Sequence, residues 1–185
     1  MSLTEKNAKI LLKVAKESIM SGLENQRPKT VEPSDYDEEL RQIRATFVTL
    51  ESYKHLRGCI GTLTAHRPLV GDVAYNAYAA AFSDPRFPKL ERLEFPALDI
   101  HISILSPSEP ITFDSEADLI QQLRPKIDGL ILSDGVHKGT FLPSVWESLP
   151  KPSDFLQRLK QKAGLSSDYW SNTIKLERYT TESIH

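Results

Sequence analysis

The segment Leu98–Leu105 reads LDIHISIL, the cleanest alternation of apolar and polar residues in the chain. Successive side chains of a β-strand point to opposite faces of a sheet, so strict alternation indicates a strand with one buried face. Ile100, Ile102 and Ile104 are expected in the core, because a shift of one residue would expose all three. The segment therefore predicts an interior strand.

Strand and helix patterns follow one another on both sides of this segment. Ala45–Leu50 is a continuous β-branched and aromatic run, which indicates a strand covered on both faces and paired with Leu56–Thr64. Further strands are expected at 127–132, 139–142 and 174–179, and helices at 4–22, 68–82, 115–123 and 153–163. Strands that arrive both as hairpin-like pairs and after helices favour an α+β fold with a mainly antiparallel sheet flanked by helices.

Composition sets the broad class. The 185 residues include 39% hydrophobic and 26% charged residues with a net charge of −2, so bulk attraction to nucleic acid is not expected. A single cysteine excludes an internal disulfide and a cysteine-based zinc site. The N-terminus lacks a signal-peptide core, and no apolar run is long enough for a membrane span. A cytoplasmic location is expected.

The most suggestive motif is Leu56–Gly61, with the sequence LRGCIG. Two glycines inside a strand-like run mark a bulge or a close approach of a ligand or another backbone. A cation at Arg57 beside Cys59 would favour the nucleophilic thiolate. The alternative is a buried, space-filling cysteine beside a structural bulge, because cysteine is among the most buried residue types. Both interpretations remain open at this point.

Three polar residues, Asp99, His101 and Ser103, share one face of the Leu98–Leu105 strand. A nucleophilic Cys59 would need a base within hydrogen-bond reach and a third group to orient that base. His101 and Asp99 supply the residue types, and a solvated polar sheet face is the plainer explanation. The five histidines show no metal-binding spacing, and no phosphate-loop or dinucleotide fingerprint occurs, so no metal and no cofactor are expected.

The segment Ser83–Phe87, SDPRF, follows a predicted helix and contains an aspartate, Asp84, and an arginine, Arg86, two positions apart. Asp84 could accept hydrogen bonds from its own turn, with Arg86 lying over that turn. Alternatively, the planar guanidinium of Arg86 offers a fork for a carboxylate or a phosphate. Because Arg57 also sits in a glycine-punctuated segment, we expect both arginines to approach one cleft together with Asp84.

Several segments, in order, resemble the AMMECR domain family over nearly the whole chain. They are LRGCIG at 56–61, SDPRF at 83–87, DGL at 128–130, TFLPSVW at 140–146, and FL at 155–156 followed by KAGL at 162–165. The resemblance implies a single domain over residues 1–185, with a large lobe holding an antiparallel sheet and a smaller lobe beside it. The family motif carries over to Arg57, Gly58, Cys59, Gly61, Asp84 and Arg86. Relatives commonly carry glutamine where this chain has Ser144.

The resemblance brings no settled activity. Bacterial and archaeal relatives are often encoded beside, or fused to, a Memo-like protein and a radical-SAM protein, which implies a shared pathway. Two functions follow as hypotheses. The first is a binding or accessory module that recognises an anionic ligand or a partner protein through Arg57-Gly58-Cys59 and Asp84–Arg86. The second is an enzyme that uses Cys59 as nucleophile and a histidine, His101, as base in a cleft between the lobes. The absence of a triad spacing or nucleotide fingerprint favours the first.

Overall fold

The chain divides into two compact units in the computed structural model, which describes residues 3–185. Unit 1 runs up to Leu105 and takes in Glu182–His185, and unit 2 spans Ser106–Thr181. Unit 2 is therefore an insertion between two parts of unit 1. Among residues 3–185, no helix combines the length and the apolar character that crossing a bilayer requires.

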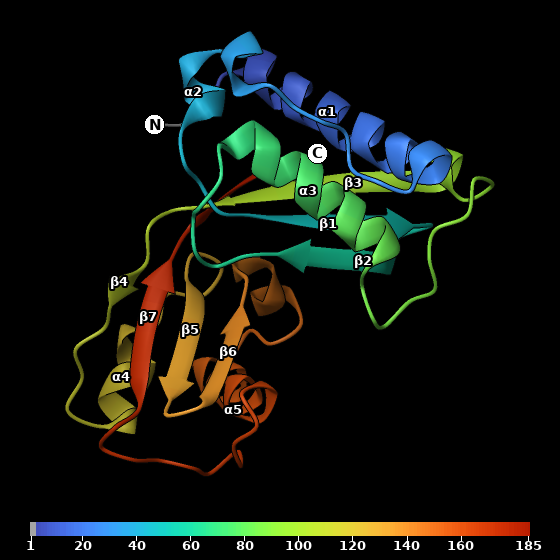
Figure 1. The fold of residues 1–185 in the computed structure, drawn as a ribbon. Helices are drawn as coiled ribbons and strands as arrows, with labels where there is room; N and C mark the ends of the chain where they lie inside the picture. The colour runs from blue at the N-terminus through green and yellow to red at the C-terminus, as the bar shows by residue number, and fades with distance from the viewer. Residues whose placement is uncertain (1–2) are drawn as a thin grey trace. The chain divides into compact units, whose positions relative to one another are not determined.

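Unit 1 is an antiparallel four-stranded sheet with helices on one face (Figure 1). The strand order is β2-β1-β3-β8. The strands are β1 (Thr46–Ser52), β2 (His55–Gly61), β3 (Leu98–Leu105) and β8 (Thr181–Ile184). The α-helices are α1 (Glu5–Asn25), α2 (Glu38–Arg41) and α3 (Leu69–Phe82), with 3-10 turns at Pro33–Asp35 and Phe95–Ala97. Helices α1 and α3 pack on each other, α3 contacts β1 and β2, and α1 contacts β3.

The interior strand predicted from LDIHISIL is confirmed as β3, which pairs with β1 along nearly its whole length. Ile100, Ile102 and Ile104 are 6%, 0% and 1% exposed, so alternate side chains fill the core beneath the helices. Strand β1 was expected to be covered on both faces, and this is wrong: only alternate residues such as Val48 are buried. An antiparallel sheet with helices on one side buries only one face of each strand.

Helix α1 also differs from the prediction that Gly22 ends it. The helix continues to Asn25 and is capped by Gln26 in the left-handed conformation. Gly22 lies inside the helix, where an added Cβ would lie 2.1 Å from the Phe82 ring. This glycine therefore allows α1 to pack closely against the end of α3, and it does not mark the end of a helix.

Unit 2 has its own sheet and its own core. Its strands are β4 (Glu109–Pro110), β5 (Gly129–Asp134), β6 (His137–Phe141) and β7 (Lys175–Tyr179), in the order β4-β7-β5-β6. Its helices are α4 (Glu116–Gln122) and α5 (Pro152–Lys162), with a 3-10 turn at Pro143–Glu147. Trp146 stacks on Phe155 with ring centroids 3.8 Å apart, and both side chains are fully buried. Helix α4 is capped by Ser115, whose hydroxyl accepts from the Asp118 amide.

Candidate functional site

The residues of LRGCIG lie on β2, an edge strand of unit 1. The pairing of β1 with β2 shifts at one point, because Leu50 faces Gly58 while Glu51 faces Leu56. Arg57 is therefore the extra residue of a β-bulge, as the glycines had suggested. Bulges redirect side chains and are frequent at sheet edges, and this one places Arg57 over the loop that follows α3.

The two glycines of the motif make room in opposite directions. A Cβ at Gly58 would lie 2.1 Å from the carbonyl oxygen of Ala80, so this residue allows α3 to approach the sheet. A Cβ at Gly61 would lie 2.3 Å from the Phe47 ring, which covers that position on the other face. Cys59 alternates with Gly58 and so points away from α3. The expectation of a buried, space-filling thiol against the approaching helix is not met, and the residue is half-buried.

Asp84 and Arg86 close the outer edge of β2 at Cys59. The Cys59 amide donates to Asp84 Oδ2 at 2.9 Å, and Arg86 Nη2 donates to the Cys59 carbonyl at 3.3 Å. Arg86 also binds Asp84 through Nε at 3.0 Å and Nη2 at 2.7 Å. The outward backbone groups of Cys59 thus bond to side chains, which protects this stretch of edge from pairing with another chain.

Asp84 is nearly buried, with 2% of its side chain exposed, whereas 55% of the Arg86 side chain is exposed. The hydrogen bonds from Arg86, and then those from the Cys59 and Arg86 amides, hold the pKa of Asp84 well below its usual range. The same pair raises the pKa of Arg86. Both groups stay charged at any ordinary pH, so Arg86 is a fixed cation with one accessible side.

Arg57 is held by a residue that sequence reasoning missed, Glu94. Arg57 Nε and Nη2 donate to the two Glu94 oxygens at 2.7 and 3.0 Å, which is the bidentate geometry of a strong pair. The Glu91 amide donates to Glu94 Oε2 at 2.8 Å. Only 11% of the Arg57 side chain is exposed, and its Nη1 is buried without a hydrogen-bond partner among residues 3–185. No local pattern could have paired positions that are 37 residues apart.

The two arginines lie near one aromatic ring, that of Phe87, and the cleft expected at this place stays a prediction. The guanidinium carbons of Arg57 and Arg86 lie 5.9 and 5.5 Å from the centroid of Phe87. These distances are within the range of cation–π attraction. The aromatic ring therefore forms a flat surface with two positively charged guanidinium groups beside it. The structure therefore brings Arg57, Cys59, Asp84 and Arg86 together around Phe87, and we call this group the β2-edge patch.

His101 lies on the same face of the sheet as Cys59, but not beside it. Cys59 faces Thr49 across β2 and β1, and Thr49 faces His101 across β1 and β3. Neighbouring strands are about 4.8 Å apart, so the two backbones are about 10 Å apart with Thr49 between them. Cys59 Sγ is 3.2 Å from Thr49 Oγ1, while His101 Nε2 is 3.6 Å from Glu51. Asp99 lies two residues from His101 on this face.

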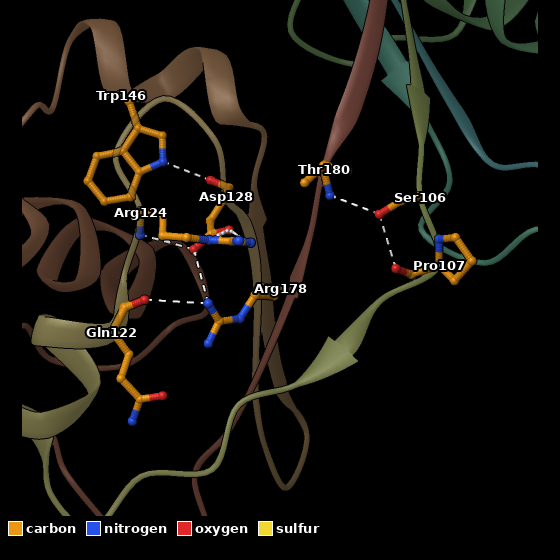
Figure 2. Close-up of polar contacts among 8 residues, drawn as sticks. All are labelled: Ser106, Pro107, Gln122, Arg124, Asp128, Trp146, Arg178 and Thr180. Atoms are coloured by element: carbon orange, nitrogen blue, oxygen red, sulfur yellow. Dashed lines mark hydrogen bonds and ion pairs between the residues drawn. The ribbon is translucent and has the colours of Figure 1, made fainter. Parts of the chain in front are cut away.

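A second part of the family pattern, DGL at 128–130, has a structural role in unit 2. The buried Asp128 carboxylate accepts from the Arg124 amide at 3.0 Å and from Arg124 Nη2 at 2.6 Å, with Arg178 Nη1 at 3.6 Å (Figure 2). Its carbonyl accepts from Trp146 Nε1 at 2.7 Å. Asp128 thus ties the end of α4 to β7 and to the core. Among residues 3–185, no cluster of three or more histidine, cysteine or acidic side chains is arranged to hold a metal.

Comparisons with known proteins show the family and the fold. The AMMECR1 family model matches residues 12–184. A protein of Methanothermobacter thermautotrophicus is 33% identical over 189 residues, which cover 99% of this chain and 96% of that protein. A protein of Thermotoga maritima is 38% identical over 158 residues, covering 83% and 86%. The crystal structure of the uncharacterized protein PH0010 from Pyrococcus horikoshii superposes with a TM-score of 0.91 at 31% identity, covering 99% of this chain and 93% of that one.

The fold and the β2-edge patch thus define an α+β protein with an inserted second unit and a capped sheet edge. The chain belongs to the AMMECR1 family.

Proposed function

We propose that this protein is a binding module and that its β2-edge patch recognises an anionic group on a ligand or on a partner protein. The observation that carries the proposal is the convergence of Arg57 and Arg86 on Phe87. Their hydrogen bonds to Glu94 and Asp84 hold both guanidinium groups in place before any ligand arrives. Preorganised groups lose little conformational entropy on binding, which favours recognition.

The internal carboxylates set a limit on the affinity. Asp84 and Glu94 offset the charges of the two arginines, so long-range attraction is weak and short-range hydrogen bonding must provide the selectivity. Arg86 has a half-exposed side chain and supplies the accessible donors of the patch, whereas Arg57 Nη1 is buried and has no acceptor among the described residues. A planar carboxylate or a phosphate matches such donors geometrically.

The test uses inorganic phosphate and citrate as probes, with binding followed by calorimetry and by NMR of the arginine Nε–H groups. We expect Arg86→Gln to weaken binding at least about fivefold, as the loss of one charge-assisted hydrogen bond implies. Arg92→Gln is the matched control, because Arg92 is also a surface arginine paired with a carboxylate, that of Glu24. Equal affinities of the two variants, or no binding of either probe by the wild-type protein, would contradict the proposal.

The partners proposed from the family resemblance are a Memo-like protein and a radical-SAM protein. If the β2-edge patch forms that contact, Arg86→Gln should abolish co-elution with a purified Memo-like protein from the same genome, and Arg92→Gln should not. Co-elution that survives Arg86→Gln would place the partner contact elsewhere. This experiment is independent of the probe titration, so each half of the proposal can fail alone.

The second candidate function is an enzyme with Cys59 as nucleophile. It is favoured by the half-buried position of Cys59 on the face away from the helices, in one cross-strand row with Thr49 and His101. Because β1 lies between β2 and β3, a proton moving from Cys59 to His101 would have to pass through the Thr49 hydroxyl. Alkylation of Cys59 faster than that of the amino acid cysteine, and slowed by His101→Gln, would support the enzyme. Slow labelling that His101→Gln leaves unchanged would contradict it.

A further inference from the structure

Unit 2 contains an open cavity of about 700 Å³ where the turn between β5 and β6 meets the segment that leads into β7 (Figure 1). Oxygen-bearing side chains contribute to its wall, among them those of Ser133, Asp134, Asn172 and Thr173. All of these residues belong to unit 2, whereas the β2-edge patch belongs to unit 1. The volume is within the range of protein sites that take small ligands.

Asp134 is surrounded by hydroxyl groups. The residue is 9% exposed, and its Oδ2 accepts from Tyr169 and Ser171 at 2.8 and 2.7 Å, while its Oδ1 accepts from Thr173 at 2.6 Å. These hydrogen bonds, the one from Thr173 first, lower the pKa of Asp134, so the carboxylate is charged at neutral pH. The cavity wall therefore carries a negative charge that its neighbours hold in place.

Two of these hydroxyls also lie against each other. Ser171 Oγ is 2.8 Å from Thr173 Oγ1, which is a hydrogen-bond distance. A hydroxyl carries one proton, and both protons are already used in the short bonds to Asp134. Three short contacts thus share two protons, so the contact between Ser171 and Thr173 brings lone pairs together. Such a contact is repulsive unless a proton or a cation lies against both oxygens.

A third proton would have to lie on Asp134, and the lowered pKa of this carboxylate opposes that at neutral pH. A cation instead uses lone pairs that the hydrogen bonds leave free. Asp134 Oδ1 keeps one, and Thr173 Oγ1 keeps two. Ser171 Oγ also keeps one, because its other lone pair accepts from the Thr173 amide at 3.2 Å. Three neighbouring oxygens therefore retain the capacity to bind a cation.

The spacing of these oxygens favours an ion of a particular size. Ca²⁺ binds oxygens at about 2.4 Å, often as a pentagonal bipyramid, whose neighbouring equatorial oxygens are about 2.8 Å apart. Mg²⁺ binds oxygens at about 2.1 Å in an octahedron, whose neighbouring oxygens are about 3.0 Å apart. Thr173 Oγ1 lies 2.6 Å from Asp134 Oδ1 and 2.8 Å from Ser171 Oγ, which fits the larger ion. The cavity leaves room for water molecules to complete its coordination shell.

We propose that Asp134, Ser171 and Thr173 form a binding site for a hard divalent cation of the size of Ca²⁺, with one carboxylate, two hydroxyls and water as ligands. A single acidic ligand makes the site weak, and we expect a Kd of about 1 mM. No metal was expected from the histidine and cysteine spacings, and a site built mainly of hydroxyls lies outside such motifs. The ion would join β5 to the segment before β7. The site is independent of the proposed function of the β2-edge patch.

The charges near the site give a way to distinguish a cation from an anion as its ligand. Lys175 lines the same cavity, and its ammonium group repels a cation there. His137 faces Asp134 across the pair of β5 and β6. Removing the charge of Lys175 should therefore strengthen the binding of a cation and weaken the binding of an anion.

The test titrates the whole chain with CaCl2 at constant ionic strength and follows the NMR amide signals of Asp134 and Thr173. We expect saturable shifts, and a rise in Tm of about 3–6 °C at a concentration ten times the Kd. Asp134→Asn should weaken binding at least about tenfold, because it removes the charge. Thr173→Val replaces the hydroxyl by a methyl group of similar size and should weaken binding at least about threefold. Lys175→Met should strengthen binding about twofold.

Thr180→Val is the matched control for Thr173→Val, because Thr180 is also an exposed threonine of unit 2. It binds Ser106 through its backbone: the Ser106 amide donates to the Thr180 carbonyl, and the Thr180 amide donates to the Ser106 hydroxyl, both at 2.9 Å (Figure 2). The exposed Asp154→Asn is the control for the loss of charge. Both controls should leave Ca²⁺ binding unchanged.

Three results would overturn the proposal. The first is the absence of saturable shifts up to about 20 mM Ca²⁺, or shifts that Asp154→Asn reduces as much as Asp134→Asn does. The second is an equally strong response to Mg²⁺, which would contradict the argument from size. The third is a carboxyl carbon of Asp134 that titrates above about pH 6 without Ca²⁺, which would show that a third proton joins the oxygens. Thr173 and Lys175 are exposed, so their variants keep the test decisive even where Asp134→Asn fails to fold.

Discussion

Gly58→Ala should destabilise unit 1, because the added methyl group would press against the backbone of α3. The new Cβ would lie 2.1 Å from the Ala80 carbonyl oxygen and 3.0 Å from its carbonyl carbon. Both atoms belong to the backbone of α3, so no side-chain rotation can relieve the contact. Strand or helix must move by about 1 Å to restore ordinary van der Waals separation, and overpacking of this kind costs about 1–3 kcal/mol or slightly more.

We expect a loss of about 3 kcal/mol in the free energy of unfolding, which for a chain of this size lowers Tm by about 6–12 °C. Urea denaturation followed by circular dichroism measures the first quantity, and calorimetry measures the second. Gly71→Ala is the matched control: it lies in α3 with no atom within 4 Å of its added Cβ. It should be neutral or stabilising by up to about 1 kcal/mol. A Gly58→Ala protein within 0.5 kcal/mol of wild type would refute the close approach of α3 to β2.

Three other predictions concern the buried side chains Asp84, Asp128 and Tyr179. Because the folded-state pKa of Asp84 lies below its unfolded value, its contribution to stability is present above about pH 4 and is lost as the pH falls further. Asp84→Asn should therefore lower the free energy of unfolding by about 2 kcal/mol at pH 7, and the difference from wild type should shrink below pH 4. A difference that stays constant from pH 7 to pH 2 would contradict this. Asp128→Asn should lower the free energy of unfolding by about 2–3 kcal/mol, because it weakens the hydrogen bonds from Arg124. The exposed Asp154→Asn should leave that free energy unchanged in the same urea assay. Burial raises the pKa of Tyr179 to about 12, so ultraviolet titration should show one late phenol that Tyr179→Phe removes.

Much of unit 1 could be predicted from local pattern. The alternation in Leu98–Leu105 predicted which isoleucines are buried. Side chains of a strand alternate between two faces and only one face is covered here, so only one register buries all three isoleucines. The same reasoning failed for β1, whose apolar run suggests two covered faces although Phe47 and Thr49 are only half-buried. Phe47 packs over Gly61 of the neighbouring strand, which accounts for an apolar residue at this position. A local sequence pattern does not reveal such a contact between strands.

The candidate site was predicted as a set of residues, and the sequence could not show how those residues are used. Arg57, Asp84 and Arg86 do lie together with Cys59, as the punctuated turns indicated. The sequence gives no sign that Asp84 bonds the Cys59 amide or that Glu94 holds Arg57, because these contacts join residues 25 and 37 positions apart. Side chains that looked available for a ligand are partly engaged with one another, which is a property of tertiary packing alone.

The paired hydrogen bonds between Ser106 and Thr180 have a consequence for how the gene could be rearranged. Unit 2 leaves the chain and returns to it at adjacent points, as a cassette inserted at one position. Segments whose ends lie close together tolerate excision, exchange and circular permutation. A shortened gene that joins Ser106 to Thr180 through a two- or three-residue turn would therefore connect β3 to β8 as a plain hairpin.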